Sequence, residues 1–114
     1  MVDSLLFAIM VDIGLGRAEL LKLVLRRFPD AVAVQDNSCD LRANWVEVWA
    51  NDEADPARSE EPDGHRFYPW RVEATPMHAR VTEEEQVALA RKLREVFVDA
   101  GGRASLCANF KVRV

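Results

Sequence analysis

In some segments the hydrophobic and polar residues repeat with the period of a strand, and in others they repeat with the period of a helix. Each change between these two periods marks the start of another predicted element. Residues 5–13 (LLFAIMVDI) are apolar on both sides of an extended backbone, which predicts a strand that is covered on both faces or lies centrally in a sheet. Residues 44–51 (NWVEVWAN) alternate strictly, with valines on one side and Trp45, Glu47 and Trp49 on the other. This alternation predicts a strand with one face toward a core.

Three further segments have the composition of strands, namely residues 31–36 (AVAVQD), 66–75 (RFYPWRVEAT) and 103–114 (RASLCANFKVRV). The residues 37–43 (NSCDLRA) are polar, and we expect a turn there. Pro69 interrupts the second of the three strands. Because proline donates no hydrogen bond to a neighbouring strand, we expect that strand to lie at a sheet edge or to bulge at Pro69.

Two segments follow helical periodicity. Gly14 and Gly16 make a turn before the first, residues 17–28, whose apolar stripe is Leu21, Val24, Leu25 and Phe28. The second begins at Thr82, where Thr82-Glu83-Glu84-Glu85 forms a capping box. Its inner stripe is Leu89, Leu93, Val96 and Phe97. Gly101 and Gly102 end it, and one of them is expected in the left-handed conformation.

The predicted order of elements is β-α-β-β-β-α-β within a single domain, residues 1–114. This layout resembles a ferredoxin-like α+β sandwich with one strand added. The resemblance implies a two-layer architecture with both helices on one face of the sheet. An odd strand between the helices reverses the chain direction once more, so either the sheet is mixed or residues 31–36 lie outside it. We favour the mixed sheet.

Residues 52–65 (DEADPARSEEPDGH) are acidic and contain two prolines and one glycine. The stretch is long for a connection in a small domain, and we expect a mobile, solvated loop.

Charge and composition exclude several classes of function. The formal net charge of the 114 residues is −4, and no run of Lys or Arg occurs, which argues against a nucleic-acid partner. Asp12 and Arg17 interrupt the N-terminal apolar stretch too early for a membrane span. Cys39 and Cys107 form no CxxC motif, which favours a reducing, cytoplasmic setting without a disulfide framework.

The sequence contains only weak local motifs for ligand binding, metal binding or catalysis. Gly14-Leu15-Gly16-Arg17 lacks the third glycine and the lysine of phosphate-binding loops, so we interpret it as a turn. His65 and His78 have no partner at a metal-ligand spacing, and we expect no metal and no cofactor. Cys107 is expected to be buried and inert. Cys39 is expected in a turn, where the neighbouring Asp40 raises the pKa of its thiol.

The functional hypothesis depends on which side chains of residues 44–51 and 66–75 face away from the helices. If the valines of residues 44–51 face the helices, then Trp45, Glu47 and Trp49 face away from them. Arg71 and Glu73, with Phe67, would lie on the same open side, and Glu47 would pair with Arg71 across the strands. Large aromatic side chains exposed together mark a contact surface. The opposite register, with the tryptophans beneath the helices, is the competing interpretation.

We therefore expect a small non-catalytic binding domain. Its binding residues are Trp45, Glu47, Trp49, Phe67, Arg71 and Glu73. Its partner is a second copy of the chain, in a homodimer, or another protein. The alternative is a small enzyme or ligand sensor with a pocket between this face and a dimer mate. Its candidate residues are Asp12, Trp70, Arg71 and His78.

Overall fold

The computed structural model of the chain describes residues 5–110. Its strands are β1 (Phe7–Asp12), β2 (Val32–Gln35), β3 (Ser38–Leu41), β4 (Asn44–Ala50), β5 (Trp70–Pro76) and β6 (Arg103–Ala108). Its α-helices are α1 (Arg17–Arg27), between β1 and β2, and α2 (Glu83–Asp99), between β5 and β6. The expected tail of the last strand, residues 111–114, lies outside the described residues.

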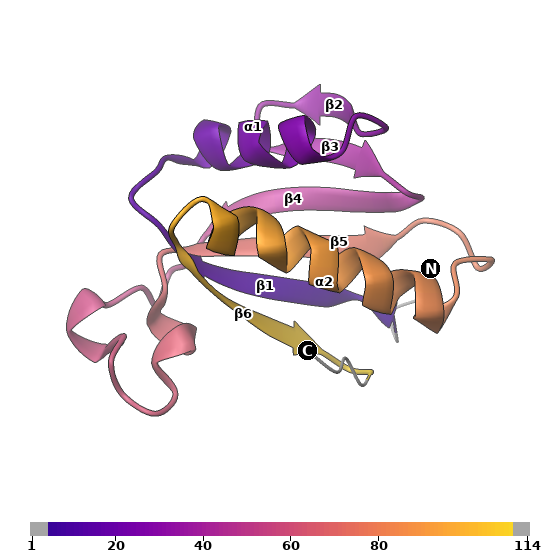
Figure 1. Ribbon diagram of the computed structural model, residues 1–114. Coiled ribbons are helices and arrows are strands. Elements are labelled where there is room, and N and C mark those ends of the chain that lie inside the picture. Colours follow the sequence, from indigo (N-terminus) through magenta and orange to yellow (C-terminus); the bar gives the residue numbers. More distant parts are fainter. Residues whose placement is uncertain (1–4, 111–114) are drawn as a thin grey trace.

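The fold is α+β, and both helices cover the same face of one sheet (Figure 1). The strand order is β2-β3-β4-β5-β1-β6. Side chains from the covered face and from the two helices form one buried cluster. In β1, Phe7, Ile9 and Val11 are fully buried in this cluster, and Ala8 and Met10 are buried on the other face of the sheet. The strand that is apolar on both sides is therefore covered on both sides, as predicted.

The sheet is antiparallel throughout the described residues, so the prediction of a mixed sheet was wrong. The reason is β3, which occupies part of the segment expected to be a turn. With six strands instead of five, the chain direction alternates across the whole sheet. Residues 31–36 also lie within the sheet, as the edge strand β2. The polar sequence of β3 conceals a core-facing side, because Cys39 and Leu41 are both fully buried.

Pro69 does not mark an edge strand. β5 begins one residue after it and lies between β4 and β1 in the interior of the sheet. Residues 66 and 67, expected to begin this strand, instead end a short 3₁₀ helix, η3 (Gly64–Phe67). Proline is compatible with a central strand when it precedes the first ladder residue, where no donor is needed. The Pro69 carbonyl still accepts a hydrogen bond from the Asn51 amide at 2.9 Å.

The helix ends follow the sequence signals closely. Thr82 Oγ1 accepts a hydrogen bond from the Glu85 amide at 3.1 Å, and the Glu85 carboxylate accepts from the Thr82 amide at 3.0 Å. The predicted capping box is therefore confirmed. Gly101 has φ +93°, the left-handed conformation that ends α2. In α1, Leu20 is buried and Leu25 is only half-buried, so the stripe is rotated slightly from the predicted one.

A buried pair of amides joins α2 to the start of β4. Asn44 and Gln86 are almost completely buried, and their side chains exchange two hydrogen bonds of 2.9 and 3.0 Å. Gln86 also donates to the Leu5 carbonyl at 3.0 Å, and Asn44 donates to the Arg42 carbonyl at 3.1 Å. All buried side-chain polar atoms in residues 5–110 have a partner. The pair therefore satisfies itself inside an otherwise apolar core.

The long connection between β4 and β5 folds onto the end of the sheet, and we call residues 51–69 the docked segment. It contains η3 and a second 3₁₀ turn, η2 (Pro56–Arg58). Asn51 closes its base, because its side-chain amide donates to the carbonyls of Arg66 and Tyr68 at 2.8 and 2.7 Å. The expected solvated loop thus has regular turns and internal hydrogen bonds, while its mobility stays a prediction.

Candidate functional site

The side of the sheet without helices, which we call the open face, carries the two predicted tryptophans. Val46 and Val48 are fully buried beneath the helices, so the alternating side chains Trp45, Glu47 and Trp49 lie on the open face. Trp49 is 44% exposed, and Trp45 is half-buried. The interpretation with the tryptophans under the helices is therefore wrong.

The strand register arranges this face in rows. Glu47 lies opposite Glu73, and Trp49 lies opposite Arg71. The expected Glu47–Arg71 pair across the strands does not form, because the register sets the two residues diagonally. Arg71 instead donates from Nε to the carboxylate of Glu73, two residues along its own strand, at 3.1 Å. On β1, Met10 continues the row of Trp49 and Arg71.

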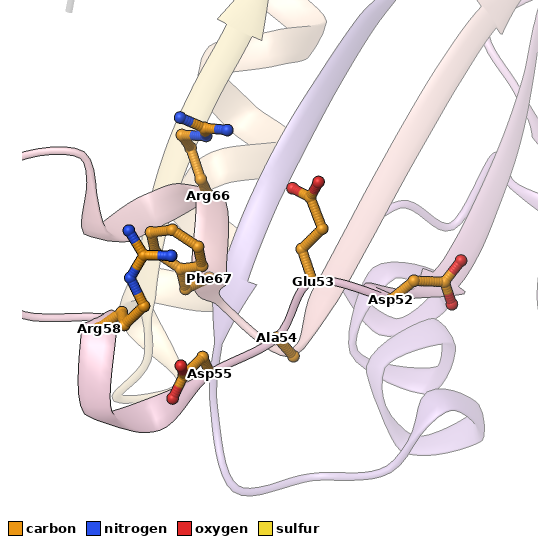
Figure 2. Close-up of a pocket in the computed structure, with 7 residues that line it drawn as sticks. All are labelled: Asp52, Glu53, Ala54, Asp55, Arg58, Arg66 and Phe67. Carbon is orange, nitrogen blue, oxygen red and sulfur yellow. The ribbon is translucent and has the colours of Figure 1, made fainter.

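Phe67, the sixth predicted binding residue, is separated from the open face. It belongs to η3 and is 8% exposed. Arg58 and Arg66 lie over its ring, with their guanidinium carbons 4.1 and 5.7 Å from the ring centroid. It lines a pocket of about 370 Å³ within the docked segment (Figure 2). Phe67 lies away from the predicted strand face because the 3₁₀ helix interrupts the alternation of side chains on which that prediction rested.

Acidic side chains also line this pocket. Asp52, Glu53 and Asp55 line it together with the two arginines (Figure 2). Asp55 is occupied locally, because its carboxylate accepts from the Ala57 amide at 3.0 Å and caps η2. Arg58 forms an ion pair with Glu61. Hydrogen bonding to Glu61 raises the pKa of Arg58 further above its usual range.

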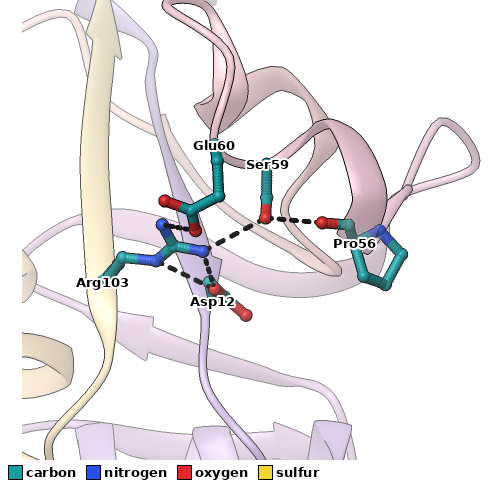
Figure 3. Close-up of polar contacts among 5 residues, drawn as sticks. All are labelled: Asp12, Pro56, Ser59, Glu60 and Arg103. Carbon is teal, nitrogen blue, oxygen red and sulfur yellow. Dashed lines mark hydrogen bonds and ion pairs between the residues drawn. The ribbon is translucent and has the colours of Figure 1, made fainter.

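Arg103, at the start of β6, fastens the docked segment to the sheet (Figure 3). Its Nε donates to Asp12 at 3.0 Å, Nη1 donates to Glu60 at 2.7 Å, and Nη2 donates to Ser59 Oγ at 3.3 Å. Its guanidinium carbon also lies 4.9 Å from the centroid of the Tyr68 ring. One edge-strand arginine therefore joins β1 to both halves of the segment.

Where the docked segment meets the open face, a cleft of about 190 Å³ forms that the sequence did not reveal. Its lining residues are Met10, Asn51, Glu53, His65, Arg66, Arg71 and Cys107. They come from β1, β5, β6 and the docked segment. These residues do not form a motif with a regular spacing along the sequence. The nearest sequence signal was the pair of histidines that flank residues 66–75, and the structure brings His65 alone of the two to this cleft.

The residues of the predicted alternative site are not assembled. Asp12 is paired with Arg103, and Trp70 donates from its indole nitrogen to the Leu15 carbonyl at 3.1 Å. His78 follows the opposite end of β5 and lines a separate pocket of about 140 Å³. A strand of this length spans about 20 Å, so Asp12 and His78 are too far apart to act on one substrate.

The two cysteines are free and differ from expectation in opposite ways. Cys39 lies in β3 and is fully buried, not in a turn. Burial, with a smaller contribution from the Asp40 carboxylate, raises the pKa of the Cys39 thiol to about 11. Cys107 was expected to be buried, but it is half-exposed at the cleft. Its position opposite Ala8 on the open face explains this exposure.

Within residues 5–110, no group of three or more His, Cys, Asp or Glu side chains is placed to hold a metal ion. The same residues contain no helix that is both long and apolar enough to cross a membrane. Comparison of the chain with protein-family models, with curated proteins and with solved structures finds no match.

Proposed function

We propose that the chain is a small non-catalytic binding domain whose open face contacts a second copy of itself. The observation that carries the proposal is the exposed indole of Trp49 beside the half-buried Trp45, on the side of the sheet without helices. Tryptophan is among the residues that contribute most to protein interfaces, and two of them on a flat strand surface form a natural centre for one.

The charges of the open face favour a second copy as the occupant. Glu47 and Glu73 form a row on one side of Arg71, so the face carries both signs. A two-fold axis through such a face places Arg71 of one copy near Glu47 of the other, twice. The tryptophans and the charged side chains then alternate within one interface, because Glu47 lies between Trp45 and Trp49 along β4. In each subunit Arg71 already holds one carboxylate through Nε, and its terminal nitrogens have no hydrogen-bond partner among residues 5–110.

The ferredoxin-like layout belongs to the same proposal. Strands β6, β1, β5 and β4 lie side by side in that order, and α1 and α2 make the two crossovers. The β2–β3 hairpin adds two strands beyond β4. In such a layout the helices protect one face, and the other is available for assembly. We place the domain in the cytoplasm, where its two thiols stay reduced.

Sedimentation equilibrium on three proteins tests the proposal: wild type, Trp49→Ser and Val98→Ser. Val98 is the matched control, because it is 41% exposed on α2, on the opposite layer of the molecule. We expect a wild-type dimer, a dissociation constant about thirtyfold weaker in Trp49→Ser, and no change in Val98→Ser.

Tryptophan emission recorded across the same concentration range provides a second measurement, because dimerisation would shield Trp49 from water. A wild-type protein that stays monomeric at high concentration would refute the second-copy proposal. Equal weakening by both serine variants would show that the contact lies elsewhere.

A further inference from the structure

We propose that the cleft between the open face and the docked segment binds the carboxylate of a small organic acid. The cleft is a separate feature from the tryptophans, although Arg71 contributes to both. The proposal goes beyond the dimer, and because both use the terminal nitrogens of Arg71, its test includes a variant that disrupts the dimer.

The first argument is the availability of cationic donors. Among the ion pairs of residues 5–110, Arg17, Arg27, Arg42, Arg58 and Arg103 each have a carboxylate partner. Arg66 has none there, and it lines the cleft. Arg71 binds Glu73 through Nε, which leaves its terminal nitrogens for another acceptor. Two arginines with unpaired terminal nitrogens therefore line one cleft, and a guanidinium group binds a carboxylate well because its parallel N–H donors match the two carboxylate oxygens.

The second argument is that the donors are held in place. The Asn51 side chain donates to the Arg66 carbonyl at 2.8 Å and accepts from the Glu53 amide at 3.1 Å. It therefore fixes the backbone of both walls that the docked segment contributes. Arg71 is fixed on the central strand β5. Gly64 is needed for the turn that brings His65 and Arg66 to the sheet, because a Cβ there would lie 1.9 Å from the Ser59 carbonyl oxygen.

The third argument is the apolar part of the lining. Met10, which is 6% exposed, and the half-buried Cys107 both line the cleft. Sulfur-bearing side chains of this kind accept a short hydrocarbon chain. The volume, about 190 Å³, is below the range of about 300–1,000 Å³ typical of pockets for larger ligands. A cleft of this volume, lined by two arginines and two sulfur-bearing side chains, fits a carboxylate that carries only a few carbons.

Glu53 is the feature that opposes an anion, since its carboxylate lines the same cleft. It makes the proposal sharply testable. If an anion binds beside Arg66, neutralising Glu53 should strengthen binding, whereas a cation-binding cleft should lose affinity.

The experiment titrates ¹⁵N-labelled protein with propionate, and in parallel with propionamide, which has the same shape and no charge. Amide shifts are followed at constant ionic strength, on wild type and on the Trp49→Ser variant. We expect saturable shifts at the cleft residues with propionate alone, with a millimolar dissociation constant, as a ligand with so few heavy atoms allows. The Trp49→Ser variant should bind propionate at least as tightly, because in the monomer the terminal nitrogens of Arg71 do not pair with Glu47 of a second copy. Loss of propionate binding in this variant would show that the shifts depend on the dimer.

Three further variants assign the donors. Arg66→Gln should weaken propionate binding about tenfold, and Glu53→Gln should tighten it about twofold. Arg91→Gln, an equal loss of charge on the exposed side of α2, should leave it unchanged. The proposal is overturned if no saturable shift occurs, if propionamide produces the same shifts, or if Arg66→Gln and Arg91→Gln have equal effects. Tighter binding of acetyl-Ala-Ala than of propionate would replace the small acid with a peptide terminus.

Discussion

Replacing Gln86 with leucine should destabilise the protein more than replacing Gln86 and Asn44 together. Gln86→Leu removes both hydrogen bonds between the two amides and the one to the Leu5 carbonyl. It leaves the Asn44 carbonyl oxygen buried without a donor, because that oxygen accepts from Gln86. In the double variant Asn44→Val/Gln86→Leu, neither amide remains to be left without a partner.

The expected losses in the free energy of unfolding depend on whether one or both partners of a buried hydrogen bond are removed. Removal of one partner leaves the other buried and unsatisfied, whereas removal of both leaves neither. Each buried group left without a partner costs about 1–3 kcal/mol. Gln86→Leu leaves two such groups, the Asn44 side-chain oxygen and the Asn44 side-chain N–H that donates to Gln86, and leucine returns about 1 kcal/mol through apolar burial. We expect a net loss of about 3 kcal/mol for Gln86→Leu, about 2 kcal/mol for Asn44→Val and only about 2 kcal/mol for the double variant. The coupling energy is then about 3 kcal/mol.

Urea denaturation of the four proteins in this double-mutant cycle measures these values. With a slope of about 1.5 kcal/mol per M, Gln86→Leu should lower the midpoint by about 2 M. Each curve is recorded at two protein concentrations, because dimerisation would add to the apparent stability. Additive losses, in which the double variant equals the sum of the single ones, would refute the account of a mutually satisfied buried pair.

Two further predictions concern single positions. Ala43 and its neighbour Arg42 have φ +63° and +50° in the turn between β3 and β4, so Ala43→Gly should raise the free energy of unfolding by about 1 kcal/mol in urea denaturation, and a loss of stability would contradict this. Folding raises the pKa of the Cys39 thiol from 9.0 to about 11, so the free energy of unfolding of the wild type should fall as pH rises from about 9 to about 11. The Cys39→Ala variant should lack that part of the decline. In the native protein, Cys107 should react with a thiol reagent while Cys39 does not.

Where the local pattern agreed with its tertiary environment, the sequence predicted the structure well. The capping box at Thr82 needs only neighbouring residues, and it formed as expected. The alternation in β4 placed Trp49 away from the helices, because Val46 and Val48 belong to the core whichever strands flank them. The same reasoning identified five of the six predicted residues on the open face; whether they bind a partner stays a prediction.

Errors arose where pairing between distant segments decides the conformation. The polar run that became β3 forms a strand because β2 and β4 pair with it on both sides and because Cys39 and Leu41 complete the core. Phe67 alternates with its neighbours as a strand residue would. The turn at Gly64 and the hydrogen bonds from Asn51 nevertheless hold it in a 3₁₀ helix. Local propensity is weak compared with such contacts.

The sequence by itself determines residue chemistry and short-range geometry. These were enough to establish the α+β class, both helices and the side of β4 that faces away from them. The order and register of the strands depend on which distant backbone groups pair, so they emerged only from the folded molecule. Arg103 and Asp12 are 91 residues apart, yet they meet and hold the docked segment on the sheet. The cleft with Arg66 and Arg71 likewise has walls from β1, β5, β6 and the docked segment, which approach one another only after folding.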